Sequence, residues 1–317
     1  MKKLLSLLCV LSLSAALLVA GVCAAEPIAG AQAEGPVLVW GTVQEIGEGQ
    51  VRLKNSNDRD PYREIVLTIG TETAILDAVI GAPRTFADLQ ENETLYAYVG
   101  PAMTMSLPPV ASAQVVLCGI PAGFGAPTYA EVQAVRGRED GGVDACVTGG
   151  VILHLSADTE LTAYRTKNIV GLDEIKPGAR LLSWYDIVTL SLPAQATPSK
   201  VLVFPYGYEG YVAVSEKTVR LDGEPVGEAR SVEGRTMVPV RALAEALGCT
   251  VTWQAGTNAV SVARGEEVLY RFVIGSGAVE QDGGETAVDT FAENGVTFMP
   301  VEDLAWLHGL KVEIPWP

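Results

Sequence analysis

The strongest constraint on the fold is the pattern of residues 234–253, GRTMVPVRALAEALGCTVTW. Its apolar positions follow the i, i+3, i+4, i+7 spacing of one helix face and are Val240, Leu243, Ala244 and Leu247. Pro239 suits the first helical turn, where a missing N–H costs nothing, and Gly248 suits the left-handed residue after a helix. Residues 250–253 then alternate as a strand does, up to Trp253. The stretch therefore predicts a strand, a short helix and a second strand.

The same pattern returns at residues 295–314. In this second copy, Pro300 and Gly309 match the residues at the helix ends, and Leu304 and Ala305 match the apolar face. It departs at Glu302, because carboxylates suit a helix N-terminus better than the equivalent Arg241 does. We therefore expect Arg241 to have a specific acidic partner, and we favour a structural ion pair over ligand binding. The residues predicted to be structural in residues 212–317 are Pro239, Arg241, Leu243, Leu247, Gly248, Trp253, Pro300, Leu304 and Gly309.

Both copies resemble the N-terminal "stalk" domain of copper amine oxidases, over about residues 212–317. The resemblance implies a non-catalytic accessory domain, common in secreted proteins of Gram-positive bacteria. It does not bring the oxidase chemistry with it, because copper sites of that kind need clustered imidazoles. The chain has two histidines, His154 and His308, in different predicted domains, and it has no Asn-Tyr-Asp/Glu stretch to supply a quinone. We therefore expect no cofactor and no metal.

The preceding two-thirds of the chain predict two copies of one small β domain, residues 37–118 and 129–205. Thr104-Met-Ser-Leu-Pro108 reappears as Thr189-Leu-Ser-Leu-Pro193, one of several matches at an offset of about 85 residues. The strands expected in the first copy are residues 37–46, 50–54, 64–69, 74–78, 95–99 and 114–117, with a short helix at 85–89. Short, evenly spaced strands favour an OB-like β-barrel. The expected fold is thus multidomain and mainly β, with two OB-like repeats before an α+β stalk-type domain of two strand–helix–strand units.

Two linkers separate these domains, residues 119–128 (GIPAGFGAPT) and 206–211. The second linker carries Tyr206, Tyr208 and Tyr211, which form either a sugar-stacking patch or the packing of a domain junction, and the junction is the favoured interpretation. Trp184 and Tyr185 are the other aromatic candidates for polymer binding. No other ligand-binding residues are predicted.

Residues 1–25 have the pattern of a secretory signal peptide, with Lys2 and Lys3 before an apolar run and small residues at its end. A spacer, residues 26–36, follows. Two alternatives remain, an uncleaved anchor and a lipid on Cys23, for which the preceding Val22 is a poor fit. We expect a secreted or envelope-associated protein that meets a membrane only through an uncleaved signal segment.

The net charge of −16 argues against nucleic acid and anionic lipid as partners. Of the cysteines after residue 25, Cys118 and Cys146 either pair or stay free, and Cys249 is expected to be an inert core thiol. The acidic residues are scattered along the sequence, as on a solvated surface.

No motif for catalysis stands out. The sequence has no Gly-x-Ser-x-Gly, His-Glu-x-x-His or phosphate-binding loop, and His154 lies in an apolar run typical of a hydrogen-bonded strand histidine. The sequence therefore predicts a non-catalytic binding or spacer protein of the cell envelope. Its expected partner is a wall polysaccharide or another envelope protein. The alternative hypothesis is a secreted hydrolase whose carboxylates meet only in the fold.

Overall fold

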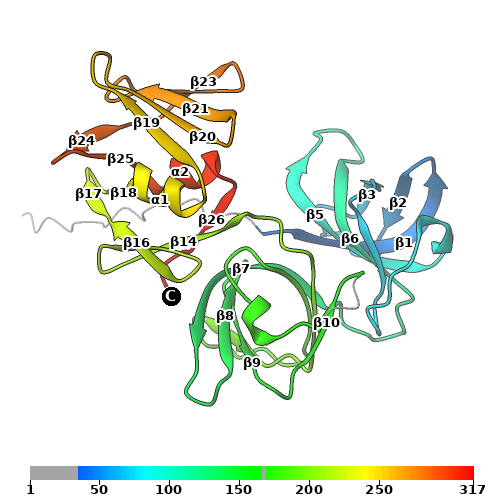
Figure 1. Ribbon diagram of the computed structural model, residues 1–317. Coiled ribbons are helices and arrows are strands. Elements are labelled where there is room, and N and C mark those ends of the chain that lie inside the picture. Colours follow the sequence, from blue (N-terminus) through cyan, green and yellow to red (C-terminus); the bar gives the residue numbers. More distant parts are fainter. Residues whose placement is uncertain (1–34, 166–168) are drawn as a thin grey trace, which may run out of the picture. The chain divides into compact units, whose positions relative to one another are not determined.

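The computed structural model describes residues 35–165 and 169–317 and is mainly β (Figure 1). The expected signal peptide and residues 26–34 of the spacer lie outside the described residues. Within the part that the structure describes, no helix has the length and apolarity needed to span a membrane.

The first β domain is a closed five-stranded barrel. Its strands are β1 (Val37–Gly47), β2 (Gln50–Lys54), β3 (Glu64–Thr68), β4 (Ala74–Asp77), β5 (Thr94–Met103) and β6 (Val110–Cys118). The ring runs β1-β2-β3-β6-β5 and back to β1, with β3 and β6 parallel and the other neighbours antiparallel. β4 joins β6 outside the ring. Every strand expected here is present, and a short 3-10 helix (Phe86–Asp88) lies where a helix was predicted.

Alternation along the strands builds the barrel interior. Val51 and Leu53 of β2 and Ile65 and Leu67 of β3 are fully buried, while the residues between them are less so. Gly41 of β1 lies against the backbone of Lys54 in β2. A Cβ at this position would come within 2.7 Å of that backbone. The close approach of the two backbones at this point therefore requires glycine.

The second β domain repeats this strand pairing. Its strands are β7 (Thr128–Gly137), β8 (Val143–Val147), β9 (Val151–Leu155), β10 (Glu160–Ala163), β11 (Arg180–Trp184), β12 (Ala194–Ala196) and β13 (Lys200–Val203). β12 and β13 together occupy the place of β6, since β12 runs parallel to β9 and β13 runs parallel to β10. The repeated sequence is thus accompanied by a repeated order of strands.

The two β domains share a buried cluster formed by their outer faces. Tyr98 of β5 contacts Tyr129 of β7 with ring centroids 5.7 Å apart, and Tyr129 contacts Phe204 at 5.3 Å. Trp184 Nε1 donates a hydrogen bond to the Ala78 carbonyl at 2.8 Å. The aromatic residues on these strands therefore serve contact between domains as well as each barrel.

The C-terminal domain contains two α-helices and three small sheets. Its helices are α1 (Val240–Ala246) and α2 (Val301–Leu307). Its strands are β14 (Gly210–Ser215), β15 (Thr218–Leu221), β16 (Glu224–Glu228), β17 (Arg230–Val232), β18 (Arg235–Pro239), β19 (Thr250–Gln254), β20 (Ala259–Arg264), β21 (Glu267–Val273), β22 (Ala278–Gln281), β23 (Gly284–Ala287), β24 (Phe291–Glu293), β25 (Val296–Pro300) and β26 (Leu310–Val312). The sheet orders are β16-β15-β14-β26, β17-β18-β25-β24 and β19-β20-β21-β22-β23.

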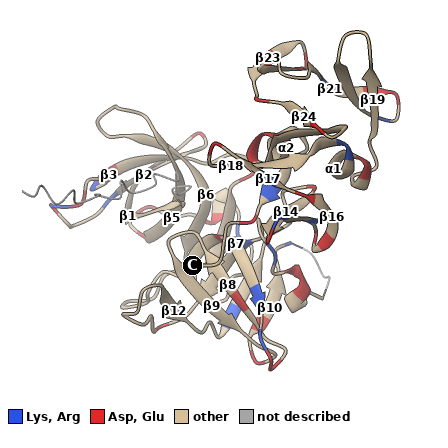
Figure 2. Cartoon of the chain, turned by 90° about the vertical axis from the view of Figure 1, so that its left-hand side faces the viewer, with Lys and Arg blue, Asp and Glu red and all other residues tan. Residues whose placement is uncertain are grey.

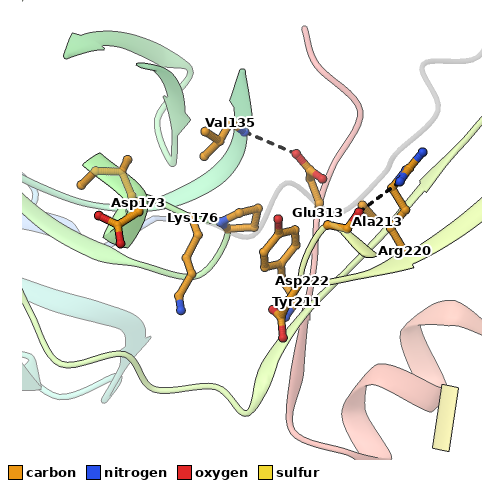
Figure 3. Close-up of a pocket in the computed structure, with 11 residues that line it drawn as sticks. Val135, Asp173, Lys176, Tyr211, Ala213, Arg220, Asp222 and Glu313 are labelled. Atoms are coloured by element: carbon orange, nitrogen blue, oxygen red, sulfur yellow. Dashed lines mark hydrogen bonds between the residues drawn. The ribbon is translucent and has the colours of Figure 1, made fainter. Parts of the chain in front are cut away.

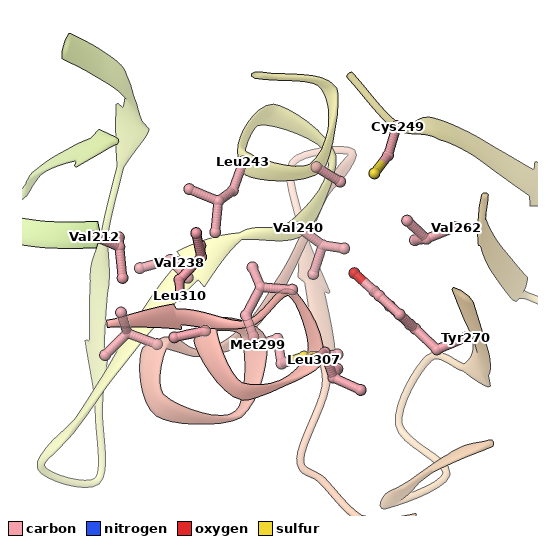
Figure 4. Close-up of a cluster of buried hydrophobic side chains, with 14 of the residues drawn as sticks. Val212, Val238, Val240, Leu243, Cys249, Val262, Tyr270, Met299, Leu307 and Leu310 are labelled. Atoms are coloured by element: carbon pink, nitrogen blue, oxygen red, sulfur yellow. The ribbon is translucent and has the colours of Figure 1, made fainter. Parts of the chain in front are cut away.

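The apolar face predicted for α1 is buried, as Figure 4 shows. Val240 and Leu243 have almost no exposed surface, and Leu247 packs against the same cluster. Leu304 of α2 is equally buried. This confirms that the helical spacing marks the core side of the segment.

The helix boundaries differ slightly from the prediction. Pro239 and Pro300 are N-cap residues and close the preceding strands, one position earlier than the first helical turn expected for Pro239. Gly248 (φ 75°) and Gly309 (φ 64°) take the left-handed conformation just after each helix.

All three described cysteines are buried and free, so Cys118 and Cys146 do not pair. Burial raises the pKa of the Cys118 thiol to about 11. Cys249 belongs to the core of the C-terminal domain, as expected.

Candidate functional site

A cavity of about 940 Å³ lies beside the second β domain, and we call it the His154 cleft. Its walls come from the linker before β7, from β9 and from the loop between β11 and β12. Residues that line it are Phe124, His154, Trp184, Tyr185, Asp186 and Gln195. It thus places two of the predicted aromatic candidates, Trp184 and Tyr185, beside polar side chains.

His154 forms the polar centre of this cleft. Its Nδ1 lies 2.8 Å from Asp144 Oδ1, and its Nε2 lies 2.9 Å from Gln195 Oε1. Asp144 faces His154 directly across the β8–β9 pair, and Gln195 comes from the neighbouring β12. His154 is therefore a hydrogen-bonded strand histidine, as predicted, but it is also partly exposed at a cavity wall.

A second cavity, of about 540 Å³, also reaches His154 and carries most of the nearby charge. Its lining includes Arg138, Asp140 and Asp144. Arg138 contacts Asp140 at 2.5 Å and Asp144 at 3.7 Å. The hydrogen bond from the Gly142 N–H lowers the pKa of Asp140 most strongly, and the Arg138 guanidinium lowers it further. His154 thus separates an aromatic cavity from a charged one.

Trp184 and Tyr185 differ in the contacts that each ring makes outside the His154 cleft. The Trp184 indole is bound to Ala78 and has the Lys200 ammonium 5.0 Å from its ring centroid. Tyr185 packs one side against the barrel core while remaining in the cleft lining. Of these two rings, Tyr185 is the one without a contact to the first β domain in the interactions described here.

Tyr206 and Tyr208 lie at the junction with the C-terminal domain. The Tyr206 hydroxyl donates to the Pro177 carbonyl at 2.7 Å, and the Tyr208 hydroxyl donates to Glu131 at 3.2 Å. A Cβ on Gly178 would come within 2.7 Å of the Tyr208 ring, so the ring is tightly covered. These contacts favour the junction interpretation over an open stacking patch.

Tyr211 lines a separate cavity of about 590 Å³, shown in Figure 3, with Asp173, Asp222 and Glu313. Burial raises the pKa of Glu313, whose carboxylate accepts a hydrogen bond from the Val135 N–H at 3.4 Å. Asp222 accepts the Tyr211 N–H at 2.9 Å. Carboxylates that are distant in sequence therefore line one cavity, which we call the Glu313 cavity.

A fourth cavity, the Trp253 groove, lies in the C-terminal domain and has a volume of about 700 Å³. Its apolar lining includes Pro239, Val251, Trp253, Ile274, Val296 and Phe298. Trp253 was predicted to be structural, but its side chain is 54% exposed and forms part of the groove wall. Trp253 pairs with Val260 in the β19–β20 ladder, and the alternation seen in the sequence does not specify which face of that pair is covered.

Arg241 has the acidic partner that the sequence predicts. Its guanidinium contacts Glu245, one helical turn further along α1, at 3.1 Å, and donates to the Val251 carbonyl at 3.0 Å. Both side chains are about half exposed, so this pair contributes little to stability.

The remaining acidic residues are dispersed. Figure 2 shows Asp and Glu spread over all three domains. Among residues 35–165 and 169–317, no three His, Cys, Asp or Glu side chains gather in a way that would hold a metal ion.

Comparison with known families identifies the C-terminal domain. Residues 213–315 match the family described as the copper amine oxidase N-terminal domain, and the match does not extend to the rest of the chain. That domain is non-catalytic. No curated protein matches the sequence.

Proposed function

We propose that this chain is a non-catalytic binding and spacer protein of the bacterial cell envelope, and that its second β domain binds a wall polysaccharide. The observation that supports this most is the His154 cleft, where Tyr185 lies beside the hydrogen-bonding groups of His154 and Gln195. Sugars present an apolar ring face and several hydroxyls, which match an aromatic ring and such polar groups.

The position of the cleft on the barrel supports the same proposal. We infer that both β domains are OB-like, because the ring order β1-β2-β3-β6-β5 places three sequential strands beside a parallel return. OB-folds bind oligosaccharides and oligonucleotides on the second and third strands and the adjoining loops. In the second domain these strands are β8 and β9, which carry Asp144 and His154. The net charge of −16 favours a polysaccharide over a nucleic acid.

The C-terminal domain supplies the spacer part of the proposal. We infer that it consists of two strand–helix–strand units, β18-α1-β19 and β25-α2-β26, joined where β18 pairs with β25. The match to a non-catalytic domain supports a spacer. The signal peptide expected at residues 1–25 supports an extracytoplasmic location.

Replacing Tyr185 by alanine is expected to weaken binding to purified wall polysaccharide by roughly tenfold, because one aromatic contact is lost. The measurement is the Kd on polysaccharide and on peptidoglycan at low salt. Trp306→Ala is the control and should leave the Kd unchanged, since Trp306 is an exposed aromatic residue that lines none of the cavities described above. Failure of the unaltered protein to bind either polymer would leave the spacer role alone.

The Glu313 cavity favours a second candidate function, a hydrolase. The raised pKa of Glu313 suits a general acid, and Asp173 or Asp222 in the same cavity would serve as the base. This candidate predicts that the protein releases reducing ends from wall polysaccharide and that Glu313→Gln slows release about 100-fold or more. The exposed Glu209→Gln is the control. Absence of product with the unaltered protein would eliminate this candidate.

A further inference from the structure

Two equivalent loops carry four of the five most exposed large apolar side chains in residues 35–165 and 169–317. They are residues 104–108 and 189–193, which we call the TφSφP loops after their shared Thr-apolar-Ser-apolar-Pro pattern. Their apolar members are Met105 (103% exposed), Leu107 (98%), Leu190 (103%) and Leu192 (99%). Such side chains pack against nothing in their own molecule, so they contribute nothing to its core.

Both loops are held in shape by the same side-chain hydrogen bonds. In the first, the Thr104 and Ser106 hydroxyls lie 2.6 Å apart, and the Ser106 hydroxyl donates to the Pro108 carbonyl at 2.8 Å. In the second, Thr189 and Ser191 repeat these contacts at 2.6 and 2.7 Å. The polar side chains are therefore engaged within each loop, while the apolar ones between them are exposed to solvent.

The Trp253 groove is a concave, mainly apolar surface on the same chain. Its charged rim is internally paired, because Arg230 contacts Glu228 at 3.3 Å and Arg241 contacts Glu245 at 3.1 Å. Neither TφSφP loop contains an ionisable residue. Two copies of a chain with net charge −16 repel one another over most of their surface, but these two surfaces bring no net charge together.

We propose that the TφSφP loops dock into the Trp253 groove of a second copy of this chain. The four apolar side chains of the loops are fully exposed in one molecule. The groove volume of about 700 Å³ is large enough to hold a pair of such side chains. A protruding surface that meets a different, concave surface makes a head-to-tail contact, which can add copies in series. Such association lies beyond the polysaccharide binding proposed above.

The test is sedimentation velocity of the purified protein over a wide concentration range. A loop variant carries Met105→Ser, Leu107→Ser, Leu190→Ser and Leu192→Ser, and a groove variant carries Trp253→Ser and Val296→Ser. We expect the unaltered protein to associate, and each variant to associate at least about tenfold more weakly, because apolar burial is lost. Ile169→Ser is the matched control, since Ile169 is 99% exposed outside both loops.

Mixing the two variants makes the test specific. The loop variant retains its groove and the groove variant retains its loops, so the mixture should form a dimer through one intact interface. Thermal unfolding checks that both variants fold, which is expected because the substituted side chains are exposed.

Four outcomes would overturn the proposal: a monomeric unaltered protein, association that ignores the loop substitutions, association that ignores the groove substitutions, and a mixture that does not dimerise. Loop-dependent flotation with neutral lipid vesicles, without self-association, would assign the loops to a membrane surface instead. These measurements contain no polysaccharide, so they are independent of the function of the His154 cleft.

Discussion

Replacing Leu243 by alanine is expected to lower the free energy of unfolding of the C-terminal domain by about 2–5 kcal/mol. Leu243 lies on α1 with 0% of its side chain exposed, inside the cluster that α1, α2 and the three sheets share (Figure 4). Removing its branched end leaves a cavity between α1 and the strands packed against this helix, β16, β18, β19 and β25, and these elements cannot all move inward to fill it.

Chemical denaturation followed by far-UV circular dichroism measures this loss. Leu190→Ala is the matched control, because the chemical change is identical but Leu190 is 103% exposed. The control should alter the free energy of unfolding by no more than about 0.5 kcal/mol. Equal effects of the two substitutions would contradict the assignment of Leu243 to the core.

Local elements were predictable because their signals lie within a few residues. The Asp222-Gly223 pair indicates a type I′ hairpin, and both residues have positive φ, 48° and 88°. The apolar spacing of α1 and Gly248 after it are also local signals, and both predicted the observed structure. Repetition added a second line of evidence, since two copies of one pattern must fold by the same local rules.

The candidate site was less predictable because its residues meet only through pairing between strands. Asp144 was not singled out by sequence reasoning, although a β8–β9 hairpin register places it opposite His154. Gln195 reaches the same histidine from a strand that follows a long loop, and no local pattern specifies that parallel pairing. The exposure of Trp253 depended likewise on which face of its sheet the helices cover.

Acidification from pH 6.5 to 4 is expected to destabilise the C-terminal domain through His308. This histidine follows α2, is 4% exposed, and has its Nε2 2.8 Å from the Tyr270 hydroxyl. Its Nδ1 has no hydrogen-bond partner among the residues that the structure describes. Burial, helped by the charge of Arg264, lowers the pKa of His308 to about 4. His308 therefore binds a proton less readily in the folded state than in the unfolded chain, where its pKa has the ordinary value of about 6.5.

The sign follows from proton binding. Between pH 6.5 and 4 the unfolded state binds more protons, so the free energy of unfolding falls as the pH falls, by up to about 3 kcal/mol near pH 4. Above pH 6.5 both states are neutral at this residue and the effect vanishes.

Denaturation midpoints measured between pH 6.5 and 4 should therefore decline more steeply with falling pH in the unaltered protein than in His308→Gln. Glutamine keeps an acceptor for the Tyr270 hydroxyl but cannot take up the proton, so the difference between the two proteins isolates His308 from the carboxylates that titrate at lower pH. Parallel pH profiles would show that His308 binds its proton equally well in the folded and unfolded states, and would contradict the lowered pKa that its burial causes.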